Sequence, residues 1–160
     1  MADSPLTHFH QDGSARMVNV SQKPITLRTA RAEGRVIMRP ETLELIRNQS
    51  ISKGDVLAVA RLAGIMGAKR TSELIPLCHS LGIDSVELQF EVLEPDQVRI
   101  ESVVQVQART GVEMEALTSV SVAALTIYDM CKSVDREIRI SDIQLLEKSG
   151  GKQDYARHQE

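Results

Sequence analysis

Aromatic residues are nearly absent from this chain of 160 residues, which has no Trp, two Tyr and two Phe. A surface that stacks single-stranded nucleic acid needs several aromatic side chains. The formal net charge of −3 also argues against the basic footprint that DNA or RNA binding requires. We therefore expect no nucleic-acid partner, and a core built from Val, Ile, Leu, Ala and Met.

Cysteines, targeting signals and long apolar runs are scarce as well. Cys78 and Cys131 are too few and too far apart for a disulfide framework or a zinc cluster. His8 and His10 have the spacing of a metal-binding pair, but without other ligands nearby two solvated histidines are the simpler interpretation. The N-terminus lacks a secretory pattern, and no apolar run approaches the ~18 residues of a membrane span. We expect a cytoplasmic protein with no metal, no cofactor and no membrane partner.

Alternation of apolar and polar residues predicts four strands in a single domain. The segment 1–20 is polar and aperiodic, so we expect a flexible arm, then one catalytic domain over 21–152 and a tail at 153–160. The predicted strands are 28–38, 86–92, 98–108 and 137–147. Turn residues at 94–97 predict a hairpin, and a change of phase near Ser141-Asp142 predicts a bulge.

Three helices are predicted at 41–47, 55–70 and 110 to about 131. Ala60, Gly64 and Gly67 are small enough to let another backbone approach the second helix closely. The third opens with Thr110-Gly111-Val112-Glu113, which has the form of a capping box, and it is apolar almost all round. Such a helix must be covered on both sides, and a second copy of the chain is the simplest cover.

The order of these elements is strand, helix, strand, strand, helix, strand. This order predicts an α+β protein of the ferredoxin-like βαββαβ class, with an antiparallel sheet and its helices packed on one face.

Asp129 stands out chemically, because it lies in the apolar helix with Lys132 three residues later, on the same face. Apolar surroundings push a carboxylate towards its neutral form, and an adjacent ammonium pulls it back. Such a pair can act as general acid and base, or it can be a structural ion pair near a helix end. Spacing alone leaves both interpretations open.

The other candidates each have an ordinary explanation. Glu113 fits as the capping-box acid, and Glu115 as a first-turn acid favoured by the helix dipole. His79 and Cys78 fit as buried core residues. Lysines lie at helix ends and in the Gly-rich loop 148–152, where they could hold phosphates or be solvated, and the chain has no P-loop or Gly-x-Gly-x-x-Gly run.

Six motifs, in this order, closely resemble the molybdenum cofactor biosynthesis protein C family, the cyclic pyranopterin monophosphate synthases. They are Lys53-Gly54-Asp55-Val56, Ala68-Lys69-Arg70-Thr71, Leu74 to His79, Thr110 to Leu117, Ala123 to Lys132 and Lys148 to Lys152. The resemblance extends from about Leu6 to Lys152. Ser80 and Asn19 depart from the family pattern, which usually has proline and aspartate at those positions.

The resemblance implies a function in molybdenum cofactor biosynthesis. The family converts a cyclised dihydroguanosine triphosphate, made from GTP by a partner radical enzyme, into cyclic pyranopterin monophosphate and pyrophosphate. By motif, Asp129 is the catalytic acid/base, with Lys132 and Lys53 also catalytic. The residues expected to bind substrate are Leu77, Cys78, His79, Glu113, Met114, Glu115 and Lys69, with Lys148 and Lys152 at the phosphates. Lys23 lies outside every motif, so we expect Lys53→Ala and Lys132→Ala to lower activity far more than Lys23→Ala does.

Glu115 and Asp129 lie 14 residues apart on the same helix, which corresponds to about 21 Å. One reacting centre cannot touch both residues of a single helix. If both belong to one pocket, the second must come from a neighbouring subunit, and the resemblance implies a hexamer formed from three dimers. The competing functions are a ligand-binding regulatory module of the same fold, or a structural subunit, neither of which requires Asp129 with Lys132 and the extra lysines.

Overall fold

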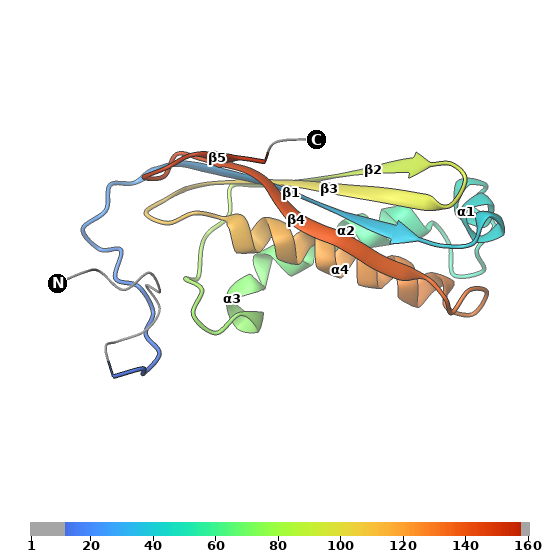
Figure 1. Cartoon of the computed structure of the whole chain (residues 1–160), viewed down its shortest axis with the longest axis horizontal. Helices are drawn as coiled ribbons and strands as arrows, with labels where there is room; N and C mark the ends of the chain where they lie inside the picture. Colours follow the sequence, from blue (N-terminus) through green and yellow to red (C-terminus); the bar gives the residue numbers. More distant parts are fainter. Residues whose placement is uncertain (1–11, 158–160) are drawn as a thin grey trace.

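An antiparallel sheet with two long helices on one face forms the protein (Figure 1). The computed structural model describes residues 12–157. The strands are β1 (Thr26–Ile37), β2 (Ser85–Leu93), β3 (Gln97–Ala108), β4 (Arg139–Ser149) and β5 (Tyr155–Ala156). The helices are α1 (Pro40–Arg47), α2 (Val56–Lys69), α3 (Thr71–Leu74) and α4 (Glu113–Cys131). The pair His8 and His10 lies outside the described residues.

The strand order is β2-β3-β1-β4-β5, with every neighbouring pair antiparallel. Without the short β5, this is the order of a ferredoxin-like βαββαβ unit, which confirms the predicted fold class. The β2–β3 hairpin confirms the prediction from alternation. Sequence analysis did not predict β5 or the single turn of α3, because neither is long enough to show a period.

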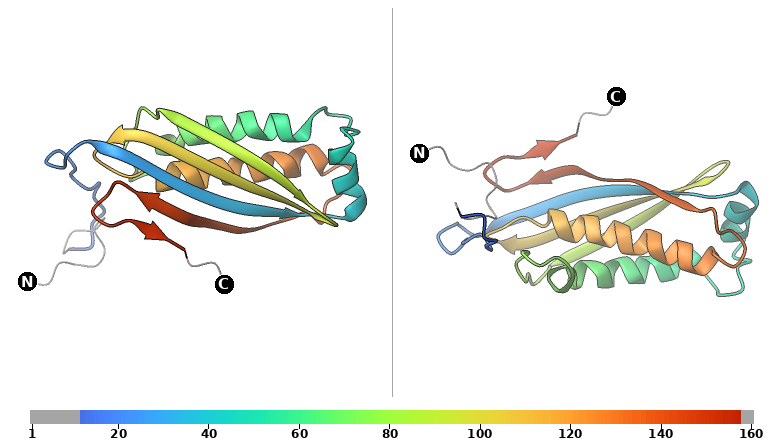
Figure 2. Two further views of the ribbon diagram at one scale, coloured as in Figure 1. Left: turned by 90° about the horizontal axis from the view of Figure 1, so that it is seen from above. Right: turned by 60° about the horizontal axis from the view of Figure 1, so that its bottom comes forward.

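The two faces of the sheet differ in character. Alternate residues of β1, among them Ala30, Ala32 and Val36, are fully buried against the helices. The opposite face carries ion pairs such as Arg99 Nε–Glu33 Oε2 at 2.7 Å. Viewed from above, α2 and α4 lie side by side under this sheet (Figure 2). The sheet therefore has one apolar face, and both long helices cover it.

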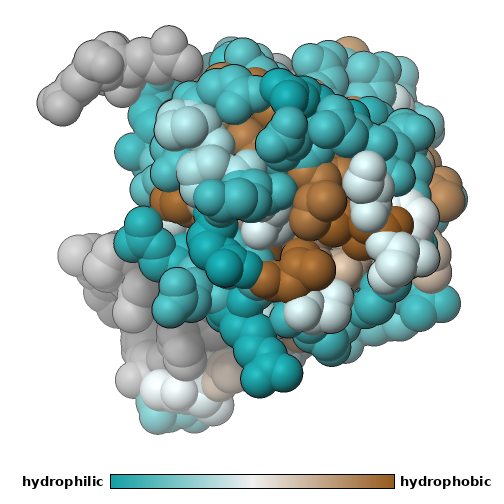
Figure 3. All heavy atoms as spheres, turned by 90° about the vertical axis from the view of Figure 1, so that its right-hand side faces the viewer, coloured by the Kyte–Doolittle hydropathy of each residue, from teal (hydrophilic) through white to brown (hydrophobic). Residues whose placement is uncertain are grey.

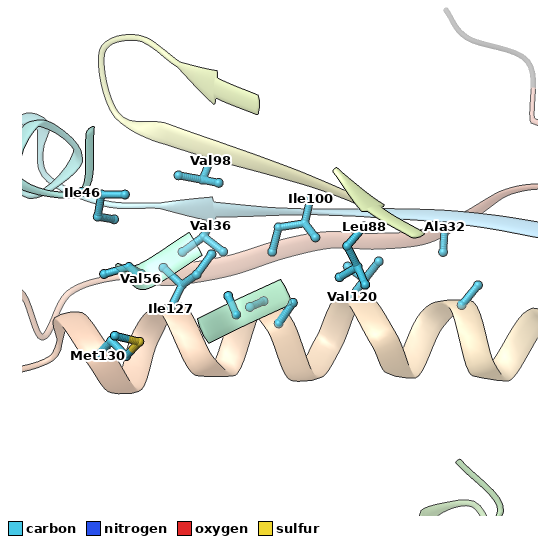
Figure 4. Close-up of a cluster of buried hydrophobic side chains, with 14 of the residues drawn as sticks. Ala32, Val36, Ile46, Val56, Leu88, Val98, Ile100, Val120, Ile127 and Met130 are labelled. Atoms are coloured by element: carbon cyan, nitrogen blue, oxygen red, sulfur yellow. The ribbon is translucent and has the colours of Figure 1, made fainter. Parts of the chain in front are cut away.

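The core fills the space between the sheet and the helices. Side chains from α4, such as Val120 and Ile127, point towards Val36 and Ile100 of the sheet (Figure 4). At Gly64 of α2, an added Cβ would lie 3.0 Å from the carbonyl oxygen of Ser119 in α4. The small residues of α2 thus allow the close helix packing that the sequence predicted.

The bulge predicted near Ser141-Asp142 is present. Arg35 pairs with Ser141 and Glu33 with Gln144, so β4 carries one extra residue there, and Asp142 has a φ of +53°. This confirms that the change of phase marks a bulge.

The predicted capping box is wrong. Helix α4 begins at Glu113 with Val112 as its N-cap, and no side chain caps it. The Glu113 carboxylate is instead bound by Lys148, 35 residues further along the chain. Because Val112 is the N-cap and Glu113 is the first helical residue, Thr110 and Glu113 do not occupy the positions that a capping box requires, and the carboxylate pairs with the ammonium group brought by β4.

The outer side of the helical layer retains exposed apolar residues. Val59, Leu62 and Met66 form a stripe along α2 and are 42 %, 63 % and 52 % exposed, and Leu125 of α4 is 59 % exposed. Leu125 lies on α4, the helix for which the sequence predicted further cover, whereas the stripe on α2 was not predicted. Within residues 12–157, no helix is long and apolar enough to cross a membrane.

Candidate active site

Two adjoining cavities, each of about 410 Å³, lie at the end of the sheet where α4 begins. They share a wall formed by Lys23, Thr110, Gly111 and Glu113. The first, here called the basic cavity, also contains Arg28, Arg109, Lys148, Lys152 and the loop glycines Gly150 and Gly151. The second, here called the polar cavity, also contains Val18, Val20, Leu77, Cys78, His79, Leu81, Met114 and Glu115.

Arg28 is a fixed cation of the basic cavity. It is only 8 % exposed, and its guanidinium donates to the carbonyl oxygens of Ala108 and Arg109, at 3.3 Å each. These carbonyl partners hold the group in place, and no carboxylate among residues 12–157 forms an ion pair with it. Five basic residues line this cavity, and such a group suits an anion with several charges, such as a phosphate chain.

The loop after β4 closes the basic cavity tightly. Gly150 has a φ of +82°, and an added Cβ would lie 1.9 Å from the carbonyl oxygen of Leu27. Only glycine fits there, because a side chain would meet backbone and the conformation is left-handed. The Gly-rich loop therefore brings Lys148 and Lys152 to the same cavity, as expected from the sequence.

The polar cavity combines an imidazole, a thiol and a carboxyl group. His79 is half-buried, with Nε2 lying 2.9 Å from the carbonyl oxygen of Val18. That contact requires a proton on Nε2, so a neutral ring has Nδ1 as an acceptor. His79 is thus a cavity residue rather than the fully buried core residue that was the simpler expectation.

Burial changes the titration of the two other groups in the polar cavity. Glu115 is 4 % exposed, and desolvation raises the pKa of its carboxyl group. Desolvation, with a smaller contribution from Glu115, also raises the pKa of the Cys78 thiol. Cys78 is therefore a protonated group at neutral pH and not a nucleophilic thiolate.

A separate charged cluster lies at the other end of α4, where Asp129 is held between two lysines. Lys132 Nζ donates to Asp129 Oδ1 at 2.6 Å, and Lys53 Nζ lies 3.6 Å from Oδ2 while donating to the Asp129 carbonyl at 2.8 Å. The hydrogen bond and charge of Lys132, and then the charge of Lys53, lower the pKa of Asp129. The same bond raises the pKa of Lys132.

The expectation of apolar surroundings for Asp129 is wrong. Its side chain is 60 % exposed, because it lies on the outer side of α4. At neutral pH it is a carboxylate beside two ammonium groups. Figure 3 views this end of the molecule, where hydrophobic side chains gather between hydrophilic ones.

A buried carboxylate lies in the loop that follows α4. Asp135, 2 % exposed, accepts from the backbone N–H groups of Arg39 at 2.9 Å and Glu137 at 3.0 Å, and from the Thr42 hydroxyl at 3.2 Å. Burial acts to raise the pKa of Asp135, but these hydrogen bonds and Arg39 bring it below its usual value. Asp135 therefore joins the loop after α4 to the start of α1.

The structure brings most of the expected site residues together in two groups. Eight of them line the cavities: Leu77, Cys78, His79, Glu113, Met114, Glu115, Lys148 and Lys152. Asp129, Lys132 and Lys53 form the second group. Lys69 is exposed at the end of α2 and lines neither cavity.

Sequence analysis missed three cations that line the cavities. Lys23 lies outside every motif, yet it lines both cavities. Arg28 and Arg109 were not considered. The sequence could have pointed to Arg28, because a charged residue in phase with the buried face of its strand is unusual and indicates a special role. Within the described residues, no group of three or more His, Cys, Asp or Glu side chains could hold a metal ion.

Comparison with known proteins places these features in one family. A family model described as the MoaC family matches residues 17–151. Cyclic pyranopterin monophosphate synthase 3 of Mycobacterium tuberculosis is 58 % identical over 157 residues, covering 98 % of this chain and 89 % of that protein. Cyclic pyranopterin monophosphate synthase of Desulfitobacterium hafniense is 59 % identical over 147 residues, covering 92 % and 90 %. The protein of the same name from Heliobacterium modesticaldum is 59 % identical over 149 residues, covering 92 % and 94 %.

Proposed function

The chain belongs to the MoaC family, and on that premise we propose that it converts a cyclised dihydroguanosine triphosphate into cyclic pyranopterin monophosphate and pyrophosphate. This is the reaction of a phosphorus–oxygen lyase in molybdenum cofactor biosynthesis. The observation that carries the proposal is the convergence of eight expected site residues on two adjoining cavities, one basic and one polar.

The basic cavity suits the triphosphate. The product keeps one phosphate in a ring while pyrophosphate leaves, so an internal hydroxyl must displace pyrophosphate at the α-phosphorus. Cations fixed around the phosphates, such as Arg28 and Lys148, would stabilise the charge that builds up on the leaving group. We propose Lys23 and Arg109 as further phosphate contacts, because both line this cavity.

The polar cavity suits the ring system derived from guanine. His79 and Glu115 offer an acceptor and a carboxyl group, and Leu77 and Met114 offer apolar surface. Since these groups adjoin the basic cavity across Glu113, one molecule can place its ring in the polar cavity and its phosphates in the basic one.

Asp129 is proposed as the base and Lys132 as the acid of the reaction. The lowered pKa of Asp129 keeps it ionised at neutral pH, ready to accept a proton, and Lys132 holds a proton 2.6 Å away. Lys53 would hold the Asp129 side chain and main chain in position while contributing a second positive charge.

We propose that the complete site forms between two subunits of a hexamer built from three dimers. Asp129 and the polar-cavity residue Glu115 lie near the two ends of α4, separated by about 21 Å along the helix, whose course Figure 1 shows. The exposed apolar stripe on α2 supports a contact between copies. A two-fold contact would bring Asp129 of one copy to the polar cavity of another and generate two equivalent sites.

The direct test of the function is incubation of the purified chain with the cyclised triphosphate, followed by mass detection of both products. Formation of cyclic pyranopterin monophosphate and pyrophosphate in equal amounts is the expected result. Saturable binding of the compound without turnover would contradict the proposal and favour a ligand-binding regulatory module. In the cell, a radical enzyme acting on GTP would supply the substrate, and the cytoplasmic location stays a prediction.

The shared site has its own test, which uses two inactive variants. Asp129→Asn and Glu115→Gln are purified separately and mixed under conditions that exchange subunits. Mixed dimers contain one site with both residues intact, so activity should return to about a quarter of the wild-type level for random mixing at equal amounts. Exchange confirmed by mass spectrometry without any return of activity would assign the site to one subunit.

A further inference from the structure

Glu113 is the one acidic residue among the described residues that line the basic cavity. Five basic residues surround it there: Lys23, Arg28, Arg109, Lys148 and Lys152. An acid at this position reduces the attraction of the cavity for phosphate, because it adds a negative charge beside the expected position of the anion. Its presence therefore needs an explanation other than phosphate binding.

The geometry of Glu113 supplies one. Its Oε1 accepts from Lys148 Nζ at 2.9 Å, and the two side chains are 28 % and 38 % exposed. The carboxyl group lies over Gly111, where an added Cβ would be 2.0 Å from Oε2. The absence of a side chain at Gly111 leaves room for the carboxylate on the wall between the cavities, within reach of the lysine of the Gly-rich loop.

We propose that Glu113 is a built-in counter-anion that holds Lys148 while the basic cavity is empty, releases it to a phosphate of the substrate, and takes it back when pyrophosphate leaves. A phosphate chain carries more charge than a carboxylate and displaces it from the ammonium on binding. The partly exposed carboxylate reaches water when it is displaced, so the exchange leaves no buried charge unpaired.

The same exchange acts on the product. Pyrophosphate in a cavity with five basic residues would dissociate slowly if nothing competed for them. A carboxylate tethered next to Lys148 competes at a high effective concentration, because it is part of the same molecule. Glu113 thus lowers the affinity for pyrophosphate and speeds its release. The assignment of pyrophosphate as product rests on the proposed function, whereas the exchange between anions does not.

Binding of inorganic pyrophosphate, measured by titration calorimetry at fixed ionic strength, tests the exchange without any need for turnover. Glu113→Gln should bind pyrophosphate roughly five- to tenfold more tightly than wild type, since it removes both a competitor and a repulsive charge. Glu87→Gln, which neutralises an exposed acid on β2, should stay within about twofold of wild type.

A double-mutant cycle with Lys148→Gln isolates the exchange from general repulsion. In the Lys148→Gln background, the gain from Glu113→Gln should fall to about twofold or less, because the competed cation is gone. Unchanged or weaker binding by Glu113→Gln would overturn the inference, as would an equal gain with and without Lys148. If the wild type forms no product while the cycle gives the expected coupling, the proposed function fails and the exchange stands.

Discussion

The two ends of α4 place a carboxyl group in opposite environments. At its start, Glu115 is buried at a cavity wall with a raised pKa, so its environment opposes the charged form. At its end, Asp129 is 60 % exposed, and two ammonium groups favour its charged form. At the start of α4 a buried carboxyl group lines a cavity, and burial disfavours its ionised form. At the end of α4 a charged cluster lies on an open surface.

The comparison indicates which function each end can perform alone. A cavity lined by fixed charged and polar groups can surround a ligand, so the first end is suited to binding. An exposed carboxylate between two lysines is suited to proton transfer, but nothing in the described part of the chain shields it from water. Chemistry at Asp129 therefore requires a wall from another molecule, and a second copy of the chain supplies one in the proposed dimer.

The largest effect is expected from Asp129→Asn. The amide keeps the shape of the side chain but cannot accept the proton, so product formation should fall by about 10³-fold or more. The unfolding midpoint should not change, because the residue is exposed. Initial rates from mass detection and a thermal melt measure the two quantities.

Asp142→Asn provides the matched control for Asp129→Asn. Asp142 is 58 % exposed and lies 4.0 Å from Arg35 Nε, so it is also an exposed carboxylate near a cation. Its variant should keep nearly full activity. Equal losses of activity in Asp129→Asn and Asp142→Asn would show that Asp129 has no special role in the reaction.

The next effect concerns the two lysines beside Asp129. Lys53→Ala and Lys132→Ala should each lower kcat by about 10²-fold, since each removes a positive charge beside the reacting carboxylate. Lys132 also donates a hydrogen bond to that carboxylate, and Lys53 donates one to the Asp129 carbonyl oxygen. Arg47→Ala is the control, because Arg47 is an exposed cation paired with Glu44 and Glu94. Small, equal losses in all three variants would mean that only bulk charge matters.

A third prediction concerns the loop after α4, which Asp135 joins to the start of α1. Asp135→Asn should destabilise the fold by about 2–4 kcal/mol at pH 7, because an amide group cannot accept every hydrogen bond made by the buried carboxylate. The control is Asp55→Asn, since Asp55 caps α2 and asparagine caps equally well. Urea unfolding measures both.

The pH dependence of Asp135→Asn follows from the lowered pKa of Asp135. A lowered pKa in the folded state means that the ionised carboxylate stabilises the fold above its unfolded pKa, and that this contribution is lost as pH falls through the folded pKa. The difference between wild type and variant should therefore shrink below about pH 4. A difference that stays constant from pH 7 to pH 3 would show that ionisation of Asp135 is irrelevant to stability.

The fold could be predicted from the sequence because its long strands each alternate between a buried and an exposed face. The strict alternation of 86–92 and 98–108 predicts a hairpin, since one face of each strand is buried. The loss of phase at Ser141-Asp142 predicts a bulge for the same reason. Segments without a period, such as the two residues of β5, give no such signal.

The site was less predictable from local patterns because long-range contacts decide it. Thr110 and Glu113 have the spacing of a capping box, but Lys148 from a distant strand binds the glutamate instead. Lys23 lies in an aperiodic segment, and only the folded chain brings it to both cavities. Long, specific motifs predicted eight residues that line the cavities. The distance between Glu115 and Asp129 followed from the helical rise alone.

The smallest effect is expected from removing the buried carboxyl group of Glu115 at the start of α4. Burial raises the pKa of Glu115 in the folded state, so the stability associated with its protonated form is present below the unfolded pKa and is lost as pH rises through the folded pKa. Glu115→Gln has no charge to desolvate, and it should be more stable than wild type at pH 7.5 by on the order of 1 kcal/mol. This gain in stability should vanish near pH 4, where the Glu115 carboxyl group of wild type is protonated too.

Glu41→Gln is the control for Glu115→Gln. Glu41 is also a first-turn acid but is exposed, so its variant should be no more stable than wild type. If Glu115→Gln were less stable than wild type at pH 7.5, an attractive partner would have to offset the burial of the carboxylate, and the contrast between the two ends of α4 would fail.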